Sequence, residues 1–159
     1  MVSLVIILFY LIVAILAPQI APYDPMVTIY TSDGDVVRMQ PPSMEHWFGT
    51  NRMGRDIFSQ VVWGTRVALV IGVFSAIIVV LIGLNVGLIS GYFGGMTDNV
   101  LMRLTDLTYG LPYLPFAIVL VTLLGTGIDK IIIVIAVGLW PNTARVIRSQ
   151  VLSLKQRAF

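Results

Sequence analysis

Few residues of this chain are of the types that catalyse reactions or bind metals. The sequence has one histidine, His46, and no cysteine. A disulfide within the chain, a thiolate site and a multi-histidine metal site are therefore excluded. The chain also has no Gly-Lys dipeptide, which a G-x-x-x-x-G-K-[ST] phosphate-binding loop requires, and neither H-E-x-x-H nor G-x-S-x-G occurs. The sequence predicts a non-catalytic chain without a metal or cofactor.

His46 itself lies between Glu45 and Trp47, in a stretch without hydrophobic periodicity. A lone histidine in such a loop is typical of a residue at the surface or at an interface. We therefore expect His46 to be exposed.

The composition indicates that lipid surrounds most of the chain. Of the 159 residues, 57% are hydrophobic and 11% are charged, and the mean hydropathy is +0.92. A soluble domain has roughly 25% charged residues, and so short a chain could not bury this much apolar surface. The net charge of +2 comes without a run of basic residues, so nucleic acid is not an expected partner. The sequence predicts an all-α integral membrane protein.

About four segments are apolar and long enough to cross a bilayer, which takes roughly 20 helical residues. A secretory signal peptide is the alternative for the first segment, but the basic flank and cleavage site of such a peptide are missing. Pro112 and Pro115 should kink the third segment. The four predicted spans are 1–20, 67–89, 96–124 and 131–147.

Between the first two spans lies a polar stretch rich in proline, which we expect to be extracytoplasmic. Two β-prone runs, 26–31 and 36–40, flank an Asp33-Gly34 pair, which predicts a small β-hairpin. Residues 54–66 have one apolar face and predict a short amphipathic helix at the membrane surface. The predicted organisation is a first transmembrane helix (1–20), an extracytoplasmic segment (21–66) and a membrane core (67–159).

Small and polar residues inside the spans suggest packing and pore positions. Gly83, Gly87 and Gly91 repeat every four residues, so they predict close helix packing; a contact with another subunit or with a pore stays open. Polar groups at membrane depth need water or protein beside them. The candidates for pore-facing residues on this basis are Asn85, Tyr109 and Tyr113.

The charges next to the spans predict an orientation and one ion pair. Four basic residues lie at and beyond the end of the fourth span without an acidic residue between them, namely Arg145, Arg148, Lys155 and Arg157. Because basic residues favour the cytoplasmic side, both termini are expected there. Arg103 and Asp106 are i,i+3 neighbours and could pair near the membrane surface.

Several stretches together resemble one family. They are HWFGTNRMGRDIFSQVVWGTR (46–66), GLISGYFGGMTDNVLMRLTD (87–106), WPNTARVIRSQVLSLKQRAF (140–159) and the opening LAPQIAPYDP (16–25). The chain resembles, over nearly its whole length, the inner-membrane permeases of binding-protein-dependent ABC importers, in the dipeptide/oligopeptide/nickel branch.

This resemblance implies a MetI-like fold of six transmembrane helices in a bacterial or archaeal plasma membrane. It also implies four kinds of neighbour: a second permease subunit, two cytoplasmic ATP-binding subunits, an extracytoplasmic solute-binding protein and the lipid bilayer. Peptides, or a related solute such as a nickel chelate, would be the cargo.

The family's coupling loop, with an E-A-A-x-x-x-G signature, docks on the ATPase. The sequence stops where that loop should start, so we expect a fragment clipped at both ends. The residues that resemble the approach to the loop are Ser153, Leu154, Lys155, Gln156, Arg157, Ala158 and Phe159.

Two other functions remain as alternatives. A secondary transporter or channel would work without ATP, but such proteins often have ionisable residues buried in the membrane, and the sequence predicts no buried acid in any span. A non-transporting membrane scaffold would need no ATPase partner.

Overall fold

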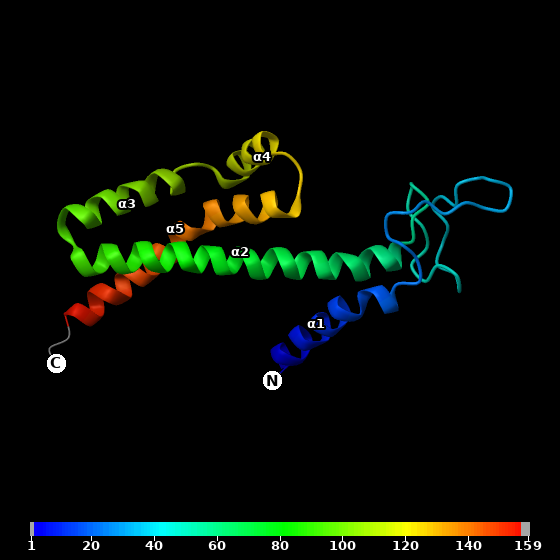
Figure 1. Ribbon diagram of the computed structural model, residues 1–159, viewed down its shortest axis with the longest axis horizontal. Coiled ribbons are helices and arrows are strands. Elements are labelled where there is room, and N and C mark those ends of the chain that lie inside the picture. Colours follow the sequence, from blue (N-terminus) through cyan, green and yellow to red (C-terminus); the bar gives the residue numbers. More distant parts are fainter. Residues whose placement is uncertain (1, 157–159) are drawn as a thin grey trace. The chain divides into compact units, whose positions relative to one another are not determined.

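The computed structural model describes residues 2–156, and its regular structure is helical (Figure 1). The helices follow the apolar segments of the sequence, because a helix satisfies its own backbone hydrogen bonds where lipid offers none. Their bounds are α1 Val2–Ile20, α2 Ile57–Phe93, α3 Gly95–Tyr109, α4 Tyr113–Leu124 and α5 Ile128–Lys155.

Three of these helices are long and apolar enough to cross a membrane, namely α1, α2 and α5. The pair α3 and α4 passes the same test together, although the two are bent by 87° at a short break. Counting the pair as one span gives four, as the sequence predicts. The helical class and the approximate number of spans are therefore confirmed.

The chain divides into two compact units, Met1–Val70 and Ile71–Phe159. In the first unit the irregular segment after α1 leads to the start of α2. Asp56 precedes α2 and caps it, because its Oδ2 accepts a hydrogen bond from the backbone N–H of Ser59 at 2.7 Å. From Ile57 the helix runs without a break for 37 residues, about 55 Å at 1.5 Å per residue. Residues 54–66 and 67–89 were predicted as two segments, but no helix breaker separates them, and both belong to α2 from Ile57 on.

The predicted β-hairpin is wrong. Tyr30 and Val36 form an isolated antiparallel bridge, and no strand occurs among residues 2–156. The two arms share few backbone hydrogen bonds, among them Val37 N–H to the Ile29 carbonyl at 3.0 Å, and each arm also bonds to residues 51–54. The Ile29 N–H donates to the carbonyl of Gly54 at 2.8 Å, and the Met39 N–H donates to that of Asn51 at 3.2 Å.

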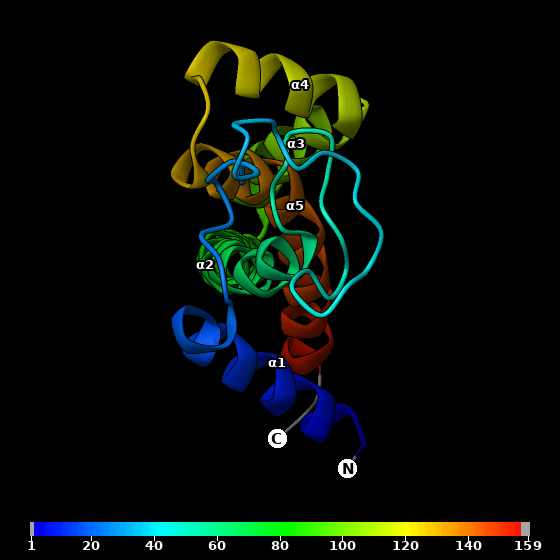
Figure 2. The same ribbon diagram turned by 90° about the vertical axis from the view of Figure 1, so that its right-hand side faces the viewer.

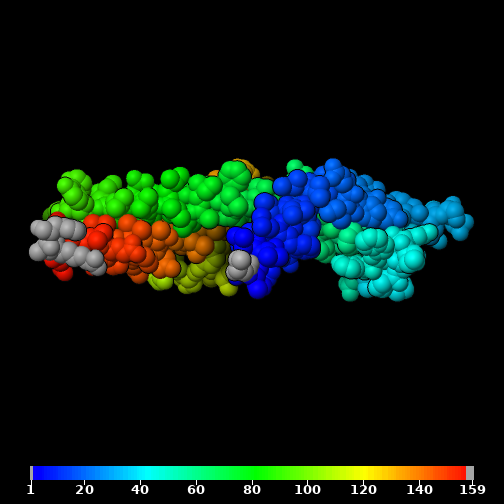
Figure 3. Space-filling view, turned by 90° about the horizontal axis from the view of Figure 1, so that it is seen from below, coloured from blue at the N-terminus to red at the C-terminus, as the bar shows by residue number. Residues whose placement is uncertain are grey.

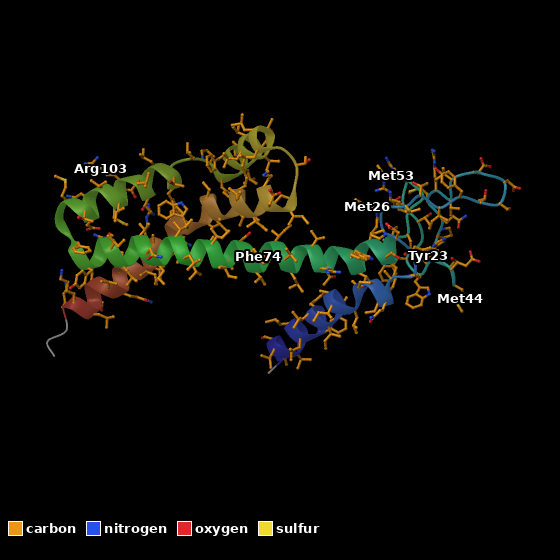
Figure 4. All side chains as sticks on the ribbon, in the orientation of Figure 1. Tyr23, Met26, Met44, Met53, Phe74 and Arg103 are labelled. Atoms are coloured by element: carbon orange, nitrogen blue, oxygen red, sulfur yellow. The ribbon has the colours of Figure 1, made fainter. Side chains whose placement is uncertain are left out.

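His46 is buried and not exposed, so the predicted surface position is also wrong. Its residual exposure is 4%, and its Nδ1 lies 3.0 Å from Oδ1 of Asp56, which is fully buried. The His46 ring also packs on Tyr23, with centroids 4.9 Å apart. Figure 4 places Tyr23 on the irregular segment after α1. Burial of His46 is possible because the cap carboxylate of α2 accepts its N–H.

In the second unit, α3 and α4 both pack on α5 (Figures 1 and 2). The predicted kink in the third span is a full break. α3 ends at Tyr109 with Gly110 as its C-cap, and Pro112 precedes the first residue of α4. Because proline restricts the residue before it to extended conformations, Leu111 cannot continue the helix.

Candidate functional site

A hollow with a mixed polar and apolar lining lies where α3 breaks into α4, and we call it the bend pocket. Its volume is about 300 Å³, and α5 supplies the wall opposite the break. Two of the three predicted pore-facing residues, Tyr109 and Tyr113, lie together in its lining. The full lining is Thr108, Tyr109, Leu111, Tyr113, Phe116, Gly138, Leu139 and Asn142.

Gly138 determines how closely Tyr113 approaches α5. A Cβ atom at this position would overlap the Cε2 and Cδ2 atoms of the Tyr113 ring. The absent side chain therefore allows the ring to lie against the α5 backbone, where it forms one wall of the pocket.

An ion pair lies beside the pocket. The Nη2 of Arg145 in α5 donates to Oδ1 of Asp106 in α3 at 2.6 Å, and the guanidinium carbon lies 4.4 Å from the ring centroid of Tyr109. The side chains of Asp106 and Arg145 are 66% and 41% exposed. The predicted ion pair between Asp106 and Arg103 does not form, because Asp106 pairs with Arg145. Figure 4 shows the reason, since Arg103 lies on the side of α3 away from α5.

A second ion pair joins the same two helices nearer the end of α5. Arg148 donates from Nε and Nη2 to the two oxygens of Asp98, at 2.6 and 2.5 Å. Ser90 of α2, which is fully buried, donates its hydroxyl to Oδ1 of the same carboxylate. The guanidinium and the hydroxyl together supply hydrogen bonds to both oxygens of the Asp98 carboxylate. This cluster therefore connects α2, α3 and α5.

The glycine stripe of α2 faces α5. Figure 3 shows these two helices side by side. A Cβ atom would lie 2.6 Å from Cβ of Thr143 at Gly83, and 2.8 Å from Cβ of Val151 at Gly91. The close approach leaves no room for a side chain at these positions.

Asn85 lies apart from the bend pocket. Its side-chain amide donates to the Leu81 carbonyl of its own helix at 2.7 Å. Asn85 lines a separate and largely apolar hollow with Met96 and Val100. The structure therefore groups Tyr109 with Tyr113 but not with Asn85.

The segment predicted to approach the coupling loop continues α5. Ser153 and Leu154 are helical, Lys155 is the last helical residue, and Gln156 caps the helix. The Nζ of Lys155 donates to the Tyr92 carbonyl at 2.8 Å, which attaches this end of α5 to the end of α2. Arg157, Ala158 and Phe159 lie outside the described residues.

The two interhelical ion pairs and the position of Asn142 were not predicted from the sequence, in which Arg145 and Arg148 indicated only an orientation. Their i,i+3 spacing places them on one face of a helix, and this is the signal that could have paired them with acids on a neighbouring helix.

Two family models match most of the chain. Residues 83–159 match the binding-protein-dependent transport system inner membrane component, and residues 1–42 match the N-terminal transmembrane domain of oligopeptide transport permease C. The chain belongs to the binding-protein-dependent transport permeases. Together with its apolar helices, this membership makes it a multi-pass protein of the inner-membrane permease class.

Individual permeases are similar to the chain over nearly all of its length. The oligopeptide transport system permease protein OppC of Bacillus subtilis is 40% identical over 159 residues, which are 100% of this chain and 50% of that protein. The dipeptide transport system permease protein DppC of the same organism is 39% identical over 155 residues, 98% of this chain and 47% of that protein. The glutathione transport system permease protein GsiD of Escherichia coli is 39% identical over 153 residues, 96% and 49% of the two chains. The chain thus spans about half the length of these permeases.

Proposed function

We propose that this chain is part of the transmembrane permease of an ATP-driven importer of dipeptides or oligopeptides. The observation that carries the proposal is the similarity, over 96% or more of the chain, to permeases named for dipeptide, oligopeptide and glutathione transport. All three named cargoes contain peptide bonds, which favours peptides over nickel chelates.

The proposed partners are a second permease subunit, two cytoplasmic ATP-binding subunits and an extracytoplasmic solute-binding protein. ATP is hydrolysed in the ATP-binding subunits and not in this chain. When ATP binds to the two ATP-binding subunits, the permease pair shifts between inward-open and outward-open states. The shift occurs because these two states differ in their affinity for the ATP-bound subunits.

In this proposal the bend pocket faces the solute path. Irregular backbone at membrane depth is tolerated where it lies within protein or lines a water-filled cavity, and broken helices in transporters often surround the substrate. The break at Gly110–Pro112 and the polar groups of Tyr109 and Tyr113 in the pocket lining support this assignment.

The proposed orientation places both termini in the cytoplasm and residues 21–66 outside, where they reach the solute-binding protein. Residues 67–159 then belong to the membrane core. The end of α5, from Ser153 through Gln156, approaches the ATP-binding subunits. Its attachment to α2 through Lys155 and Tyr92 supports a firm connection at that place.

The test is uptake of a labelled tripeptide into proteoliposomes that contain the full-length permease pair, the ATP-binding subunits and the external binding protein. Uptake is expected only with ATP and only when this permease is present. ATP-driven uptake without this permease would favour the scaffold alternative. Uptake that needs this permease but neither ATP nor the ATP-binding subunits would favour a secondary transporter or channel.

A further inference from the structure

Two Asp–Arg pairs join α3 to α5, and they differ in how completely they satisfy each other. Arg148 binds Asp98 through two hydrogen bonds, Ser90 adds a third, and the Asp98 side chain is 16% exposed. Arg145 binds Asp106 through one hydrogen bond, and the Asp106 side chain is 66% exposed. The Asp98 carboxylate is bonded on both oxygens and is little exposed, whereas the Asp106 carboxylate has one hydrogen bond and stays accessible to a ligand.

The exposed pair has an unusual position for a membrane protein. Arg145 lies ten residues before the end of α5, about 15 Å along the helix axis, near the end of the apolar part of this helix. A charged pair exposed to lipid at such a place is costly, so it faces water or protein. The bend pocket adjoins it through Tyr109, whose ring is in contact with Arg145 and also lines the pocket.

The chemistry of the Asp106–Arg145 pair fits a ligand that carries one positive and one negative group. A guanidinium has five N–H donors, and Asp106 occupies one of them, so Arg145 can bind a second carboxylate. The Asp106 carboxylate likewise has acceptor positions left for an ammonium group. Beside them, the exposed side-chain amide of Asn142 offers a donor and an acceptor to a peptide bond.

We propose that Asp106 and Arg145 form, with the bend pocket, a subsite that binds the charged termini of a peptide in transit. The carboxylate of the peptide binds Arg145, its ammonium group binds Asp106, and its backbone lies along Asn142 and the two tyrosines. This inference rests on the proposed function, since it names the residues that would meet the peptide.

The test uses the complete importer in proteoliposomes, with Asn142→Cys as a reporter in a complex free of other reactive thiols. This chain contributes no native cysteine. A charged methanethiosulfonate should modify the new thiol during ATP turnover, and trialanine should slow the modification. Trialanine amide and N-acetyl-trialanine should protect about tenfold less well, because each lacks one charge-assisted hydrogen bond.

Arg145→Gln, combined with the reporter, should abolish the difference between trialanine and its amide. The matched variant Arg148→Gln, on the same face of α5, should retain this difference. An unreactive thiol, equal protection by all three peptides, or the same loss of discrimination in both variants would overturn the subsite. Trialanine uptake by the importer with the native permease is measured in parallel. If that uptake is absent the proposed function fails, whereas uptake with an overturned subsite leaves it standing.

Discussion

A Cβ atom placed on Gly87 of α2 would lie 2.6 Å from the carbonyl oxygen of Ala144 in α5. The neighbouring atom is backbone, so no rotamer change can make room. The two helices therefore touch through their main chains at this point, and the packing energy of the helix pair depends on the absence of a side chain.

Replacing Gly87 by valine should separate α2 from α5 and lower the free energy of unfolding by about 1–3 kcal/mol, the range for overpacked cores. The measurement is thermal unfolding of the full-length permease in detergent. Gly72→Val is the matched control, because a Cβ atom at Gly72 meets no atom within 4 Å. Equal losses in the two variants would show that helix propensity, and not the contact with α5, determines the effect.

The Asp98–Arg148 pair, whose carboxylate is little exposed, should contribute more to stability than the Asp106–Arg145 pair, whose carboxylate is largely exposed. Arg148→Gln leaves a poorly exposed carboxylate without its guanidinium and should cost about 1–3 kcal/mol. Arg145→Gln removes one bond between exposed groups and should cost less than about 1 kcal/mol.

Double-mutant cycles with Asp98→Asn and Asp106→Asn, followed by thermal unfolding, check this ranking. The coupling energy should be larger for the Asp98 cycle, because there the acid and the base share two hydrogen bonds. A larger coupling energy in the Asp106 cycle would contradict the assignment of structural and binding roles to the two pairs.

Asp56 should hold the irregular segment of the first unit in place, because it caps α2 and also binds His46. Asp56→Ala removes both interactions and should cost about 1–2 kcal/mol through the cap alone. Hydrogen exchange measured by mass spectrometry should show faster exchange over residues 43–60. Asp33→Ala, at an exposed turn position, is the control and should leave that exchange unchanged. Unchanged exchange in Asp56→Ala would contradict the role of the cap.

The spans were predictable because hydropathy over about 20 residues is a local property of the sequence. The positions of His46 and Asp106 were not, since each depends on a partner that the fold supplies. His46 is buried because a carboxylate ten residues later accepts its N–H, and Asp106 pairs across 39 residues with Arg145.

The hairpin prediction failed for a related reason. The Asp-Gly pair correctly indicates a turn, since the Gly34 N–H donates to the Thr31 carbonyl at 3.0 Å. Local turn chemistry does not determine which strands pair next, and here residues 50–54 compete for the backbone of both arms. The bend pocket likewise needed the fold, because Asn142 is brought to Tyr113 only when α4 folds back on α5.

Alanine substitutions at Gly49 and Gly34 distinguish the stability cost of backbone strain from that of a steric contact. Both have positive φ, +74° and +88°, so alanine is strained at each by about 1–2 kcal/mol. At Gly49 the added Cβ would also overlap the Gln40 carbonyl oxygen, which accepts a hydrogen bond from the Thr50 N–H at 3.1 Å. At Gly34 the added atom would meet nothing within 4 Å.

Gly49→Ala should therefore destabilise the segment by clearly more than Gly34→Ala does. Limited proteolysis of the full-length permease, at a protease concentration that leaves the native segment intact, measures the difference. Cleavage within residues 21–56 should be faster in Gly49→Ala. Equal cleavage rates would mean that the strand-like pairing of Gln40 with Thr50 adds nothing to the stability of the segment, and that strain at positive φ accounts for the whole effect.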